Sequence, residues 1–160
     1  MDERTFVDEV ERDFAYLVSD RGFRVAREVF DPVHFGNGLV EFRSQHVGVQ
    51  VTLDRSQILI DIGPAGQSSD NWFSLPEVQS HFDPTGAEYQ YQFPERWDDY
   101  DEMIISEIRR AAAALRPLIG PVVTPGFDAW NELERRRTRR VRAKYRALTG
   151  KNLPESKPEG

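Results

Sequence analysis

Hydrophobic and polar residues alternate between Gly38 and Pro64, and this alternation predicts three short antiparallel strands. Successive side chains of a strand point to opposite faces, so a period of two gives one apolar and one polar face. The apolar set comprises Val40, Phe42, Val47, Val49, Val51, Leu53, Ile58, Ile60 and Ile62. Glu41 and Arg43 are expected on the outer face. The pattern is typical of an antiparallel sheet with one packed face and one wet face.

Turn residues place the connections of this sheet. Asp54-Arg55-Ser56 is a plausible hairpin connection, and Gly63-Pro64 ends the last strand. Residues 23–30 alternate as well and predict a first strand, with Phe23, Val25 and Val29 on one side. The Asn37-Gly38 pair is typical of a hairpin turn. Four strands in meander order are therefore expected.

Apolar residues at intervals of three and four predict helices in the rest of the chain. The expected helices span residues 3–19, about 75–82, about 94–119, and a final stretch that starts at Thr124-Pro125. Ser74 and Glu77 resemble a capping box before the second helix. Gly120-Pro121 is expected to stop the third.

The expected fold class is α+β. A four-stranded antiparallel β-meander would be covered, mainly on one face, by an N-terminal helix, a long helix and a basic C-terminal helix. Residues 1–150 would form a single domain, and 151–160 a mobile tail rich in Pro, Lys and Glu.

Composition excludes several classes of chemistry. The chain has 160 residues and no cysteine, which excludes a disulfide framework, thiol catalysis and cysteine-based zinc sites. No apolar run reaches the roughly 20 residues that a membrane span needs. The N-terminus is acidic and has no apolar signal core, so we expect a cytoplasmic location and no membrane partner.

No catalytic motif is present, and the sequence favours a non-enzymatic protein without a cofactor. No serine lies in a nucleophile elbow. His81 could form a metal site with Glu77 and Asp83, but no HExxH pattern or second histidine supports it, and a polar helix edge is the favoured interpretation. No metal site is therefore predicted.

The formal net charge of −6 hides an asymmetry. Residues 1–126 carry 22 acidic and 11 basic side chains, a net of −11, whereas residues 127–151 carry a net of +6. An acidic body suits a basic partner through electrostatic steering.

Acidic and aromatic residues interleave at the start of the long helix and predict a surface for a basic protein partner. Aromatic residues are favoured anchors of protein interfaces, although carboxylates at this position also stabilise the helix dipole. The candidate partner-binding residues are Trp72, Trp97, Asp98, Asp99, Tyr100, Asp101 and Glu102.

The basic segment leaves two interpretations open. Clustered arginine supplies affinity for phosphate backbones, so nucleic-acid binding through Arg135, Arg136, Arg139 and Arg140 is the alternative function. The other interpretation, which we favour, is that the basic helix pairs with the acidic body of the protein.

A leading amphipathic helix, the segments RGFRVAREVF and GLVEFRSQHVGVQVTLDRSQILIDIGP, and a tryptophan-containing loop follow one another in this chain. Over roughly residues 5–110 this order resembles small bacterial α+β proteins, some of which are similar to immunity proteins of polymorphic toxins. The resemblance implies a non-enzymatic partner-binding protein, and together with the acidic body it leads us to expect an immunity protein that neutralises a basic toxin. It assigns no functional residue and does not extend to the basic C-terminal helix.

Overall fold

The computed structural model describes residues 2–31, 37–92, 99–124 and 127–150. The chain divides into two units, Met1–Phe127 and Asp128–Gly160. The predicted single domain over residues 1–150 stays a prediction, and the predicted tail lies outside the described residues.

The first unit is α+β, and its sheet has five antiparallel strands in the order β1-β2-β3-β4-β5. The strands are β1 (Arg24–Asp31), β2 (Asn37–Arg43), β3 (Val47–Asp54), β4 (Gln57–Pro64) and β5 (Phe73–Ser74). The prediction of four strands was therefore wrong by one. The fifth strand has two residues, which is too short to show a periodic pattern.

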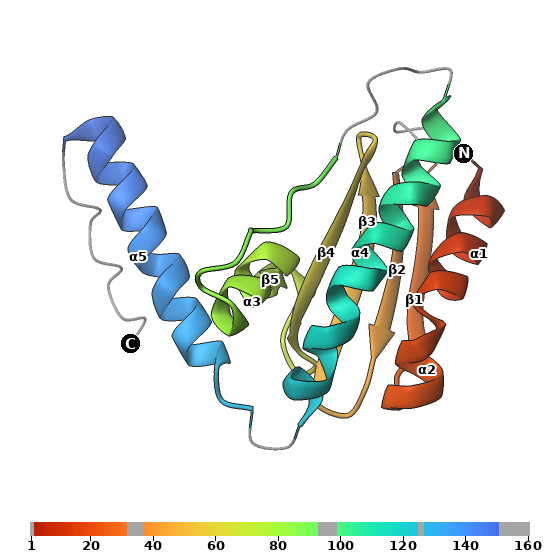
Figure 1. Ribbon diagram of the computed structural model, residues 1–160, viewed down its shortest axis with the longest axis horizontal. Coiled ribbons are helices and arrows are strands. Elements are labelled where there is room, and N and C mark those ends of the chain that lie inside the picture. Colours follow the sequence, from red (N-terminus) through yellow and green to blue (C-terminus); the bar gives the residue numbers. More distant parts are fainter. Residues whose placement is uncertain (1, 32–36, 93–98, 125–126, 151–160) are drawn as a thin grey trace. The chain divides into compact units, whose positions relative to one another are not determined.

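The helices of this unit are α1 (Glu3–Asp13), α2 (Ala15–Arg21), α3 (Leu75–Phe82) and α4 (Tyr100–Val123), with a 3-10 turn η1 (Ser69–Asn71). Helices α1, α2 and α4 lie on one face of the sheet (Figure 1). The predicted apolar set of strands β2 to β4 is buried against them. Phe14 stacks on Phe42 of β2 with the ring centroids 6.1 Å apart. This covered face holds the core.

The β3–β4 hairpin confirms the predicted connection. Arg55 and Ser56 form a two-residue turn between Asp54 and Gln57, and both have positive φ (46° and 71°). Positive φ at both central residues is the geometry that matches the twist of paired strands. The capping box is also confirmed, since Glu77 accepts hydrogen bonds from the N–H and the hydroxyl of Ser74, each at 2.9 Å.

A bulge in β1 contradicts part of the predicted alternation. The register between β1 and β2 shifts between Val25 and Arg27, so one residue is inserted in the ladder. Val25 pairs with Phe42 of the covered face, whereas Val29 pairs with Leu39 of the opposite face and is 41% exposed. Val29 therefore does not share a face with Val25.

Helix boundaries differ from the prediction at three places. The expected helix 3–19 is two helices, because the chain turns at Phe14, whose ring is buried against Phe42. Helix α4 continues past Pro117 and Pro121, and the burial of apolar side chains in its last turns offsets the missing N–H groups. Thr124 ends α4 by donating its N–H to the carbonyl of Pro121, so it does not begin the next helix.

The second unit contains helix α5 (Trp130–Thr149), which ends at Gly150 in the left-handed conformation. Its net charge is +6, from eight basic and two acidic side chains. None of the helices in the described parts of the chain combines the length and the apolar character that crossing a bilayer requires.

Candidate partner-binding face

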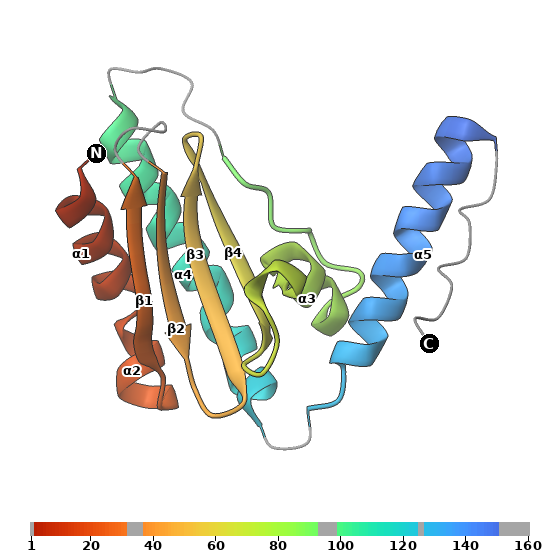
Figure 2. The same ribbon diagram turned by 180° about the vertical axis from the view of Figure 1, so that it is seen from behind.

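The second face of the sheet is open. From behind, strands β1 to β4 lie in front of α4, and no described helix of the first unit lies over them (Figure 2). A groove of about 330 Å³ crosses this open face. It is lined by Val29, Asp31, Asn37, Gly38, Leu39, Gln50, Thr52, Leu53, Asp54, Leu59 and Asp61.

Aliphatic side chains form the floor of the groove. Strand register aligns Val29 with Leu39, Leu39 with Thr52, and Thr52 with Leu59, so one row crosses four strands. Directly opposed side chains share a face of the sheet. Three of the four members of this row are aliphatic. Leu39 and Leu59 lie at positions where the alternation calls for polar residues, and this out-of-phase pattern is the signal by which the sequence could have revealed the groove.

Carboxylates surround the aliphatic row. Asp31, Asp54 and Asp61 belong to the groove, and none of its eleven described lining residues is basic. The amide of Gln50 donates to the hydroxyl of Thr52 at 3.2 Å, while its Oε1 accepts no hydrogen bond from the described residues. The groove therefore combines negative charge, an aliphatic floor and an unused acceptor.

Trp72 closes the other end of the same face. Its ring lies over Gly48 and Gly63, which pair across β3 and β4, and a Cβ at either glycine would overlap the indole. Its Nε1 donates to the carbonyl of Pro64 at 3.1 Å. Trp72 is 3% exposed, so the ring predicted to meet a partner is part of the packed structure instead.

Arg43 and Glu41 complete this closed end. The guanidinium of Arg43 lies 5.2 Å from the centre of the Trp72 ring and donates to the Glu41 carboxylate and to the carbonyl of Ala65. Glu41 lies on the outer face, as expected, but it is buried there. The buried carboxylate of Glu41 is offset by the Arg43 guanidinium, which itself lies over the Trp72 ring.

The predicted acidic surface is described in part. Trp97 and Asp98 lie outside the described residues. Asp99 precedes α4, and Asp101 and Glu102 in its first turn are exposed, while Tyr100 is half-buried. These side chains occupy the helix N-terminus, where carboxylates stabilise the dipole.

A buried carboxylate in α4 was missed by the sequence analysis. Glu107 accepts hydrogen bonds from the Tyr89 hydroxyl at 2.7 Å and from Arg110 at 2.7 and 2.8 Å. Arg110 also lies 4.2 Å from the centre of the Tyr89 ring. Burial, together with the bond to Glu107, raises the pKa of Tyr89 well above its usual range. This satisfied network fastens the segment around Tyr89 to α4 and leaves no open reactive group.

Tyr91 occupies the free edge of β4 beyond its short pairing with β5. Its hydroxyl lies 3.5 Å from the N–H and 3.4 Å from the carbonyl of Ile60. Burial raises the pKa of Tyr91 to about 12. Residues 89–92 are therefore not a further strand, but one of their side chains blocks a strand edge.

His81 does not assemble a metal site. Glu77 is engaged by Ser74, and the described residues contain no group of three His, Cys, Asp or Glu side chains placed to hold a metal. The imidazole makes edge contacts with the rings of Phe82 and Phe127 instead.

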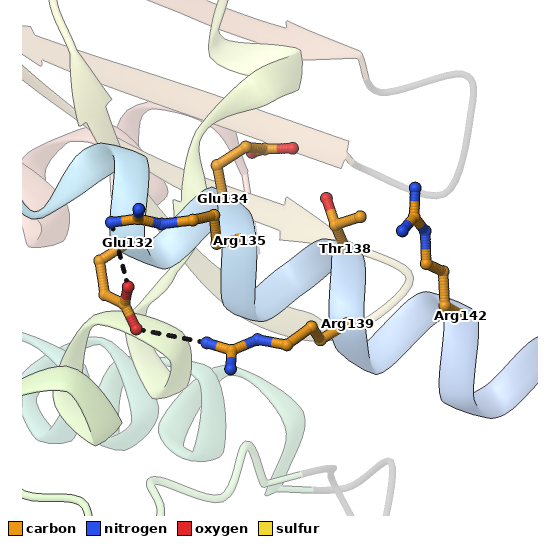
Figure 3. A pocket seen from close by; sticks show the side chains of 6 residues that line it. All are labelled: Glu132, Glu134, Arg135, Thr138, Arg139 and Arg142. Carbon is orange, nitrogen blue, oxygen red and sulfur yellow. Dashed lines mark hydrogen bonds and ion pairs between the residues drawn. The ribbon is translucent and has the colours of Figure 1, made fainter. Parts of the chain in front are cut away.

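The basic residues of α5 fall into two groups. In the first half of the helix, Glu132 pairs with Arg135, Arg136 and Arg139 at 2.9–3.4 Å. Figure 3 shows Glu132 between Arg135 and Arg139, with Arg142 farther along the helix. The pKa of Glu132 is lowered by the hydrogen bond from Arg136 and by the other guanidinium groups.

The basic side chains in the second half of α5 have no acidic partner among the described residues. Arg140, Arg142, Lys144 and Arg146 are exposed, and none makes an ion pair with a described residue. Of the four predicted nucleic-acid contacts, Arg135, Arg136 and Arg139 are thus already paired with Glu132, whereas Arg140 is not.

No protein-family model matches this chain, and neither a curated protein nor a solved structure matches it.

Proposed function

We propose that the protein is a cytosolic, non-enzymatic protein-binding module whose open sheet face receives a basic segment of a protein partner. The uncovered groove supports this proposal, because an aliphatic row bordered by carboxylates matches a segment that carries both apolar and basic side chains. The net charge of −11 over residues 1–126 would steer such a partner toward this unit. An immunity protein that neutralises a basic toxin is the specific form that the sequence resemblance implies.

The binding surface in this proposal differs from the one expected from the sequence. Trp72 is packed into the fold, and the acidic start of α4 has a sufficient structural role at its helix terminus. The groove, in contrast, exposes aliphatic side chains that no described element of the first unit covers.

A charge-matched comparison tests the proposal. The probe is a labelled amphipathic Leu/Lys peptide as long as α5, and its affinity is measured by fluorescence anisotropy. The groove-reversed variant carries Asp31→Arg, Asp54→Arg and Asp61→Arg, and the control carries Asp99→Arg, Asp101→Arg and Glu102→Arg. Both raise the net charge equally. We expect about tenfold or greater weakening only in the groove-reversed variant; equal weakening in both would reduce the effect to net charge and contradict the proposal.

Nucleic-acid binding by α5 is the second candidate function, and it is favoured by the basic side chains of its second half, which make no ion pair with a described residue. Binding of a duplex or single strand should then weaken steeply with salt and be lost in Arg140→Glu/Arg142→Glu. It ranks second because the other unit is strongly acidic and would repel a polyanion.

A further inference from the structure

An apolar stripe accompanies the unpaired charges of α5. Val141, Tyr145 and Leu148 are spaced by four and three residues and so share one face of the helix. Val141 is 50% and Leu148 77% exposed. A phosphate backbone cannot bury an apolar stripe, whereas a groove with an aliphatic floor can. The second half of α5 is thus a basic amphipathic helix without a covered apolar face.

The open groove has the complementary chemistry. Its floor of Val29, Leu39 and Leu59 suits the stripe, and its carboxylates suit the flanking Arg and Lys side chains. The length of α5 also agrees with the length of the strands that form the groove. Helix α5 has 20 residues and is about 30 Å long, and the eight-residue strands span about 26 Å, so the helix can lie along the sheet.

We infer that α5 of a second copy of this chain occupies the open groove, and that two copies exchange their helices reciprocally. The inference rests on the proposed function, and it identifies the basic segment as one that the protein itself carries. Every copy supplies one groove and one helix, so a two-fold dimer closes with two identical contacts.

Charge disfavours the simplest alternative dimer. Pairing α5 with α5 would bring two helices of net charge +6 together, whereas pairing it with the first unit brings +6 to a unit with −11 over residues 1–126.

Exchange of charges between two variants tests the inference. The helix-reversed variant carries Arg140→Glu, Arg142→Glu and Arg146→Glu, and it is combined with the groove-reversed variant described above. Each contact is repulsive within either variant alone. In the mixture, native helix meets native groove and reversed helix meets reversed groove, so both contacts are restored.

Sedimentation velocity over a concentration series provides the measurement. We expect a wild-type dimer that weakens with salt, about tenfold or greater weakening of self-association in each variant, and a heterodimer in the mixture. The Asp99/Asp101/Glu102 control should still dimerise. The inference would be overturned if the wild type is monomeric, or if neither variant weakens dimerisation. It would also be overturned if the mixture of variants stays monomeric, or if nuclease treatment abolishes the association.

Peptide binding separates this inference from the proposed function. Wild type that is monomeric but binds the Leu/Lys peptide through the groove would refute the second-copy inference and leave the proposed function intact. If a monomer binds the peptide only after helix reversal, the helix of the same chain occupies the groove, and the inference of exchange is wrong. Failure of every variant to bind the peptide would contradict the proposed function itself.

Discussion

The two ends of the open sheet face differ in whether the apolar surface of the sheet is covered. At one end, Gly48 and Gly63 make room for the Trp72 ring, and Arg43 and Glu41 seal it. At the other, Leu39 and Leu59 stand in the same sheet, but no described element of the first unit covers them. The fold covers its own apolar surface where small residues permit close approach, and it leaves a groove where aliphatic and acidic side chains meet. Such an uncovered patch indicates an interaction surface.

The largest expected difference between the two ends is in stability. Trp72→Ala should lower the free energy of unfolding by about 3–5 kcal/mol, since it leaves a cavity over two glycines. Leu59→Ala in the groove should cost about 1 kcal/mol, because its side chain is only partly removed from water. Urea unfolding measures both. Similar losses at the two positions would mean that the groove is packed as tightly as the closed end.

Replacing charged residues at the two ends should show the same contrast in stability. Arg43→Ala leaves Glu41 buried without its guanidinium and should cost about 3 kcal/mol. Arg55→Ala removes an exposed partner of Asp54, 3.9 Å away, and should change stability by about 1 kcal/mol or less. Thermal and urea unfolding of the two variants give the comparison, and a costly Arg55→Ala would show that the groove end depends on its own ion pair.

Space at the closed end can be probed by one methyl group. Gly63→Ala places a Cβ against the indole and should cost about 1–3 kcal/mol, whereas Gly66→Ala, with no neighbouring atom within 4 Å, should be nearly neutral. Chemical unfolding of the matched pair is the test. A neutral Gly63→Ala would indicate that Trp72 moves away at little cost.

Alkaline pH should lower the stability of the fold through Tyr91, which does not belong to the groove. Burial raises the folded-state pKa of Tyr91 to about 12, so its protonated form is favoured by folding. This contribution is complete below the unfolded pKa of about 10 and is lost as pH rises through about 12. Tyr91→Phe should therefore lose less stability than wild type between about pH 9 and about pH 12. Urea unfolding at both pH values measures the difference; identical losses would show that the hydroxyl at Ile60 carries no such linkage.

The sequence predicts most of this fold because strict alternation specifies strands. The set from Val40 to Ile62 is buried as expected, and the hairpin at Arg55-Ser56 lies where the polar break occurs. The bulge at Val25/Arg27 was not predictable from periodicity, because one inserted residue reverses every later side chain in the strand.

The sites depended on register, which a single sequence does not reveal. Gly48 and Gly63 are fifteen residues apart, and only their pairing across β3 and β4 leaves space for the Trp72 ring. Glu107 follows Ile104 by three residues and so borders the apolar stripe of α4, but its partner Tyr89 comes from an irregular segment. The row from Val29 to Leu59 likewise appears only once four strands are aligned.

Methyl NMR of the helix-reversed variant tests the central claim most directly, because its own helix cannot compete for the groove. Titration with the Leu/Lys peptide should shift the methyl resonances of Val29, Leu39 and Leu59, while those of the covered-face isoleucines stay unchanged. Saturable binding that leaves these three residues unperturbed and instead shifts Ile104 and Met103 near the acidic start of α4 would contradict the account.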